Sequence, residues 1–115
     1  MANSDTTQIL NKPTVLLIDD DEEVRYVMKM VVEREGLRAI EANGGEEGLR
    51  LMAENNGQIS LVILDWMMAG LSGLDVLSRM NEFSEPPPVL MLTAKNDETD
   101  VKNALLAGAC DYLFK

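Results

Sequence analysis

The sequence is short of cysteine, of long apolar segments and of positive charge. Its one cysteine, Cys110, has no partner for an internal disulfide, so a disulfide framework is excluded and Cys110 is expected to be a small core thiol. No apolar run approaches the roughly 20 residues that a transmembrane helix needs. Neither covalent cross-links nor a membrane therefore accounts for the fold, and the chain must bury a core of its own.

The shortage of positive charge limits the partners. Ten basic against twenty acidic residues give a net charge of −10. Nucleic acids and anionic membrane surfaces bind clustered lysine and arginine, so neither is expected as a direct partner. A cation or a basic protein surface suits this chain better.

The length and composition indicate one globular domain. The chain has 115 residues, of which 46% are hydrophobic and 26% charged, as in ordinary folded proteins. Residues 1–12 lack the charged-then-apolar pattern of a secretory signal, so we expect a flexible tail there, a domain over 13–115 and a cytoplasmic location.

Apolar runs alternate with segments of helical periodicity along the chain. Strands are predicted over 14–19, 37–42, 59–65, 88–94 and 111–115. Helices are predicted before Gly36 and over 44–57, 72–83 and 96–109. The first helix has apolar residues at helical spacing: Val24, Val27, Met28, Val31 and Val32. This β-α alternation predicts an α/β fold, with helices on both faces of a doubly wound, five-stranded parallel sheet.

Reactive side chains follow several of these strands. The first ends in Asp19 and Asp20, the third in Asp65, the fourth in Thr93 and the fifth in Lys115. Because parallel strands end at one edge of a sheet, these groups are expected to meet there.

Three carboxylates at one edge call for a cation. Two of them about 5 Å apart, at an effective dielectric constant of about 20, repel each other by roughly 3 kcal/mol. Hard oxygen ligands favour Mg²⁺, which retains waters and binds one or two carboxylates plus phosphate. Asp21, Glu22 and Glu23 are instead expected to serve the start of the following helix. An aspartate beside Mg²⁺, with threonine and lysine nearby, is typical of phosphoryl transfer to the carboxylate.

Four segments together resemble the response regulator receiver family of two-component signalling. They are "VLLIDDDEEVR", "LVILDWMMAGLSGLD", "VLMLTAK" and "AGACDYLFK", and with their surroundings they cover residues 14–115. The resemblance implies a flavodoxin-like fold with strand order 2-1-3-4-5. It also implies a domain that catalyses only its own phosphorylation and dephosphorylation and is not otherwise an enzyme.

Family roles carry over by position. Asp65 resembles the phospho-acceptor, Asp20 the direct metal ligand and Asp19 a ligand through water, with the backbone carbonyl of Met67 completing the Mg²⁺ site. The resemblance implies a histidine kinase or phosphotransfer protein as the donor.

The remaining roles concern the switch. Thr93 resembles the hydroxyl that bonds the phosphoryl group, Lys115 its cationic partner, and Tyr112 the aromatic that moves with Thr93. Together they would remodel the surface formed by the fourth strand, the helix after it and the fifth strand.

Two departures from the family pattern stand out. Ala69 replaces a common proline, which affects the loop and not the chemistry. The proline and final helix that usually follow the lysine are absent from the chain. We expect a longer regulator with an output domain outside this segment; a homodimer covering the gap is the alternative.

Three other functions fit this sequence less well. A flavin-binding electron carrier needs hydroxyls and amides after the first strand, where this chain has "DDDEE". A pseudo-receiver, an interaction module not controlled by phosphorylation, would not need the whole set of site residues. An aspartyl phosphatase usually has a second acid two residues after the nucleophile, where Met67 stands.

Overall fold

The computed structural model describes residues 12–55, 57–66, 68–93, 108–109 and 111–114. Strands and helices alternate along most of this length, as predicted. In chain order the elements are β1 (Thr14–Ile18), α2 (Glu22–Arg34), β2 (Arg38–Ala42), α3 (Gly45–Glu54), β3 (Leu61–Asp65), α4 (Gly73–Met80), β4 (Val89–Thr93) and β5 (Asp111–Phe114). Most of the helix predicted over 96–109 lies outside the described residues. In the part of the chain that is described, no helix has the length and apolar character to cross a membrane.

The strands form one parallel sheet in the order β2-β1-β3-β4-β5. The chain first passes from β1 to β2 on one side and then crosses to β3 on the other side of β1. The predicted α/β fold with a parallel sheet is thus confirmed. The direction of winding reverses between β1 and β3. In open α/β sheets, ligands commonly bind beyond the carboxyl ends of the two strands at such a point.

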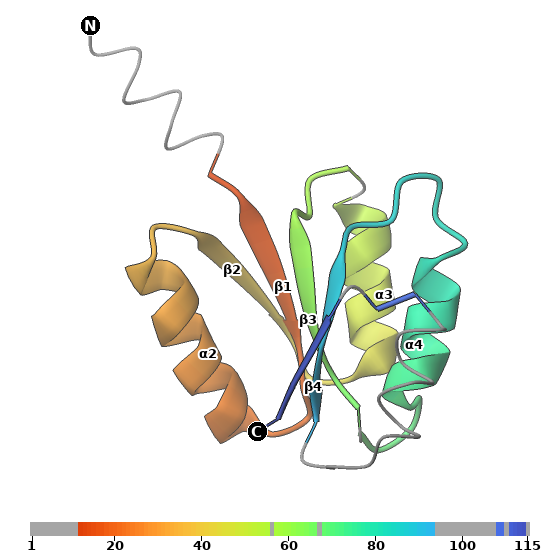
Figure 1. Cartoon of the computed structure of the whole chain (residues 1–115), viewed down its shortest axis with the longest axis horizontal. Coiled ribbons are helices and arrows are strands. Elements are labelled where there is room, and N and C mark those ends of the chain that lie inside the picture. The colour runs from red at the N-terminus through yellow and green to blue at the C-terminus, as the bar shows by residue number, and fades with distance from the viewer. Residues whose placement is uncertain (1–11, 56, 67, 94–107, 110, 115) are drawn as a thin grey trace, which may run out of the picture.

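Helices cover both faces of this sheet (Figure 1), with α2 on one face and α3 and α4 on the other. Alternate residues of β1 therefore enter two different cores. Leu16 and Ile18 belong to the core shared with α3 and α4, while Val15 and Leu17 belong to the core with Val32 of α2. Burial on both faces explains why the strand is continuously apolar.

The apolar pattern of α2 is wider than the face that the sheet covers. Val32 is buried and Met28 packs against the same core, whereas Val27 and Val31 are 58% and 51% exposed. The apolar residues at helical spacing therefore lie partly on the exposed side of this helix. In this structure the sheet covers only one narrow stripe of α2.

A capping box fixes the start of α4, which follows the loop after β3. The Ser72 Oγ accepts a hydrogen bond from the Asp75 backbone N–H at 3.2 Å, and the Asp75 Oδ2 accepts one from the Ser72 N–H at 3.3 Å. Two backbone donors that the helix itself cannot satisfy thus find partners.

Replacing Ser72 by alanine should remove this cap. We expect Ser72→Ala to lower the free energy of unfolding by about 1 kcal/mol, measured by urea denaturation. Ser78→Ala is the matched control, because Ser78 is exposed on the same helix. Equal stability losses in the two variants would contradict a capping role.

Candidate functional site

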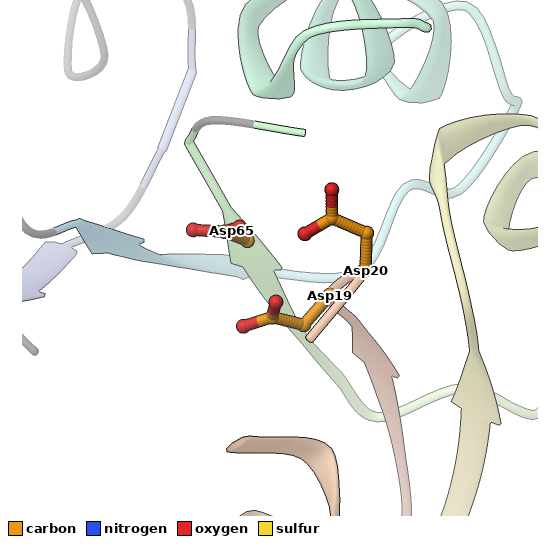
Figure 2. A group of neighbouring side chains, drawn as sticks. All are labelled: Asp19, Asp20 and Asp65. Atoms are coloured by element: carbon orange, nitrogen blue, oxygen red, sulfur yellow. The ribbon is translucent and has the colours of Figure 1, made fainter. Parts of the chain in front are cut away.

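Three carboxylates meet at the carboxyl ends of β1 and β3. Asp19 and Asp20 directly follow β1, and Asp65 is the last residue of β3. Because Ile18 pairs with Leu64 in the sheet, Asp19 and Asp65 come at the same level on adjacent strands. One carboxylate oxygen from each of the three residues lies within 4.8 Å of the others. Figure 2 shows the three side chains around one common space beyond the strand ends.

The three acids differ in exposure. Asp19 is fully buried and Asp65 is 3% exposed, whereas Asp20 is exposed to solvent. Buried carboxylates are costly unless hydrogen bonds or positive charge compensate them. The exposed Asp20 leaves one side of the cluster open, so an ion and a second ligand can reach it from solvent.

Hydrogen bonds hold Asp19 on three sides. Its N–H donates to the Ala42 carbonyl at 3.2 Å, which joins the site to β2. Its Oδ1 accepts from the Asp21 N–H at 2.9 Å. Its backbone carbonyl accepts from the Arg25 Nη1 at 2.6 Å. The orientation of Asp19 is therefore set by β2, by the turn and by α2 together.

The five consecutive acids occupy two different places in the structure. Asp21 is the N-cap of α2, and its Oδ1 accepts from the N–H groups of Glu23 and Val24 at 3.0 and 3.3 Å. Glu22 and Glu23 lie in the first turn, where the helix dipole favours negative charge. Of these five acids, only Asp19 and Asp20 lie in the cluster with Asp65. The repulsion between carboxylates in the cluster is therefore smaller than a run of five acids suggests.

Asp20 contacts the loop after β3. Its Oδ2 accepts a hydrogen bond from the Ala69 N–H at 3.1 Å. This bond links residues that are 49 positions apart in the sequence. Anything that binds Asp20 therefore acts on this loop as well.

The backbone after Asp65 is held by its neighbours. The Trp66 N–H donates to the Leu92 carbonyl at 3.0 Å, and the Trp66 carbonyl accepts from the Gly73 N–H at 2.9 Å. A Cβ on Gly73 would lie 2.6 Å from the Asp65 carbonyl oxygen and 2.9 Å from the Trp66 Cα. The start of α4 thus packs directly on the end of β3, at a distance that only glycine permits.

The other site residues predicted from the sequence are only partly described. Thr93 is the last residue of β4 and pairs with Phe114 of β5, while Tyr112 pairs with Met91. The side chains of Thr93 and Tyr112 lie outside the described part of the structure, as do Met67, Cys110 and Lys115. The structure brings Asp19, Asp20 and Asp65 together, and the remaining roles stay predictions.

Two residues that shape the site, Arg25 and Gly73, were not predicted from the sequence. Arg25 had a usable signal: it is a cation near the start of a helix, where the dipole disfavours positive charge. Gly73 had a weaker signal. It is the first residue of a helix and has no positive φ, so backbone conformation does not explain why glycine stands there. Neither signal identifies its partner, because the contacts depend on how each helix packs against the strand ends.

The donor set fits a hard divalent cation. All three groups are carboxylates, which bind Mg²⁺ or Ca²⁺ rather than softer metals. Among the described residues, this is the set of acids close enough to share one ion. One ion between them would also relieve the repulsion of three like charges.

A family model and several sequence relatives match most of this chain. Residues 15–115 match the family described as the response regulator receiver domain. The chain is 38% identical over 103 residues to the transcriptional regulatory protein AfsQ1 of Streptomyces coelicolor, covering 90% of this chain and 44% of that protein. It is 36% identical over 101 residues to SrrA of Staphylococcus aureus, covering 88% and 41%. The chain thus spans less than half the length of these relatives.

Solved structures agree with the sequence relatives. A response regulator receiver domain protein from Clostridium thermocellum superposes with a TM-score of 0.84 at 33% identity, covering 90% of this chain and 82% of that one. A chain of the CheX–CheY–BeF₃–Mg²⁺ complex from Borrelia burgdorferi gives 0.85 at 30% identity, covering 90% and 78%.

Proposed function

This chain belongs to the response regulator receiver family of two-component systems, and on that premise we propose that Asp65 accepts a phosphoryl group from a partner histidine kinase or phosphotransfer protein. One observation carries the proposal: oxygens of Asp19, Asp20 and Asp65 lie within 4.8 Å of one another at an edge open to solvent. Such crowding of negative charge is unfavourable unless a cation binds between the groups.

The proposed cation is Mg²⁺. Asp20 and Asp65 would bind it directly, Asp19 through a water molecule, and the backbone carbonyl of Met67 would complete the protein ligands. When bound, Mg²⁺ supplies positive charge that offsets the oxygens of the incoming phosphoryl group. The Borrelia burgdorferi complex, which contains Mg²⁺ and BeF₃, supports this choice of ion.

The transfer step uses the Asp65 carboxylate as the nucleophile. One of its oxygens attacks the phosphorus of a phosphohistidine, a P–O bond forms and the P–N bond breaks. The leaving imidazole takes up a proton. The buried position of Asp65 limits access of water to the reacting side chain, while the adjacent exposed Asp20 keeps the entry side open.

The proposed response follows from the charge that is added. A phosphoryl group brings about −1.5 to −2 at neutral pH. The Thr93 hydroxyl and the Lys115 ammonium would bind its oxygens, and Tyr112 would move into the space that Thr93 leaves. This shifts the population between two packings of the surface around β4 and β5 without changing the fold.

The proposal extends to the wider protein. The relatives AfsQ1 and SrrA are transcriptional regulatory proteins more than twice as long as the matched region, which supports an output domain outside this segment. We therefore propose that residues 13–115 are the cytoplasmic receiver of such a regulator.

A small phosphodonor tests the proposal directly. Incubating the chain with acetyl phosphate and Mg²⁺ should add the mass of one phosphoryl group, detected by mass spectrometry of the intact protein. Chelating the metal with EDTA should reduce this adduct by about tenfold or more, because the carboxylate cluster then repels the donor.

The two possible failures have different meanings. An adduct of equal yield in EDTA would contradict the metal site and leave Asp65 as acceptor. No adduct in either condition would contradict the acceptor role itself and favour the pseudo-receiver. Repeating the reaction with a purified histidine kinase then identifies the donor class.

A further inference from the structure

Arg25 connects the acidic cluster to the neighbouring strand. Its side chain is only 13% exposed, and its planar guanidinium group makes two contacts at once. The Nη1 donates to the Asp19 backbone carbonyl at 2.6 Å, and the Nε donates to the Glu41 Oε1 of β2 at 3.3 Å. One residue of α2 thus joins the end of β1 to β2.

The atom that Arg25 contacts controls the geometry of two proposed metal ligands. The Asp19 carbonyl belongs to the peptide group between Asp19 and Asp20, and this group is planar. Holding the carbonyl oxygen therefore fixes the direction in which the chain enters Asp20. On the other side, the Asp19 N–H donates a hydrogen bond to the carbonyl of Ala42, the residue that follows Glu41. Strand β2 consequently holds the Asp19 amide directly, and it holds the Asp19 carbonyl indirectly, through the contact of Glu41 with Arg25.

We propose that Arg25 is a positioning residue that aligns Asp19 and Asp20 for a divalent cation, with Glu41 holding the guanidinium in place. The inference rests on the proposed metal site but concerns a residue outside it. Arginine suits this task because its rigid fork presents two donors in fixed directions, which the single ammonium of lysine does not.

The loss of Arg25 should change Mg²⁺ affinity in opposite directions, depending on whether the residue acts through its charge or through its contacts. A positive charge next to an anionic site repels an incoming cation, so removing that charge alone would tighten Mg²⁺ binding. Removing an alignment contact would weaken binding, since supporting contacts around metal ligands typically contribute about 10- to 100-fold in affinity. The direction of the change therefore separates the two explanations.

Lys29 provides a matched control on the same helix. Its Nζ lies 3.7 Å from the Glu41 Oε2, so it shares the carboxylate partner of Arg25, but it is more exposed. Lys29→Gln and Arg25→Gln both remove one positive charge near Glu41. Only Arg25→Gln also removes the hydrogen bond to the Asp19 carbonyl.

The experiment is a Mg²⁺ titration of the full chain, followed by Trp66 fluorescence and by isothermal titration calorimetry. We expect Arg25→Gln to weaken Mg²⁺ binding by about tenfold and Arg25→Lys by several-fold, although lysine keeps the charge. Lys29→Gln should leave affinity within about twofold of the wild type, on the tighter side. The free energy of unfolding in EDTA, measured in parallel, separates a loss of overall stability from a loss of affinity.

Glu41→Gln keeps the proposal testable if the Arg25 variants do not fold. Without the ion pair the guanidinium is less well held, so Mg²⁺ affinity should fall by about threefold. Equal or tighter binding in Arg25→Gln, or in Glu41→Gln where the former is unfolded, would overturn the positioning role while leaving the metal site intact. A wild-type chain that binds no Mg²⁺ would overturn the metal site, and this inference with it.

Discussion

An Asp65→Asn variant is expected to take up no phosphoryl group from acetyl phosphate under conditions that label the wild type. Asparagine keeps the size of the side chain but replaces the nucleophilic carboxylate oxygen with a neutral amide. Loss of a nucleophile typically removes nearly all catalysis, so the yield of adduct should fall by about 100-fold or more. Mass spectrometry of the intact chain, with peptide mapping of the wild-type adduct, measures this directly.

The matched control is Asp21→Asn. Asp21 is also an acid next to the cluster, but it caps α2 and lies outside the set that can share an ion. Asparagine caps helices as well as aspartate does, so this variant should fold and be labelled nearly as well as the wild type. Persistent labelling of Asp65→Asn would show that the acceptor lies elsewhere. Equal loss in both variants would show that the loss is not specific to Asp65 and would contradict the assignment.

The strands and the meeting of the three acids were predictable from local sequence. Leu16 and Leu64 lie in short apolar runs that are followed by acids, and such runs are typical of strands buried on both faces. Since parallel strands end at one edge, the aspartates that follow them had to gather there. These conclusions need only periodicity and topology, and no knowledge of side-chain contacts.

Contacts between distant segments were not predictable in the same way. The exposure of Val27 and Val31 depends on how much of α2 the sheet covers, which the helix's own pattern does not contain. The bond from the Ala69 N–H to Asp20 joins two loops, and no local signal pairs them. The contacts of Arg25 could not be predicted either, because its partners are a backbone carbonyl and a residue of β2.

Gly73 is a position where one added methyl group should displace the backbone of the site. In Gly73→Ala the new Cβ would lie 2.6 Å from the Asp65 carbonyl oxygen and 2.9 Å from the Trp66 Cα. Both are backbone atoms, so no side-chain rotation relieves the overlap, and either α4 or the end of β3 must move. Overpacking typically costs about 1–3 kcal/mol, while alanine regains up to about 1 kcal/mol of helix propensity.

The expected net result is a loss of about 2 kcal/mol in the free energy of unfolding, together with weaker Mg²⁺ binding because Asp65 shifts. Urea denaturation in EDTA measures the first effect, and the Mg²⁺ titration measures the second. Gly44→Ala is the matched control, because a Cβ at Gly44 meets no atom within 4 Å and its φ of 178° suits any residue. Gly44 is the N-cap of α3, where alanine is less favourable than glycine, so this variant should lose less than about 1 kcal/mol. A Gly73→Ala variant as stable as Gly44→Ala would mean that α4 does not pack on the end of β3 in the way this structure describes.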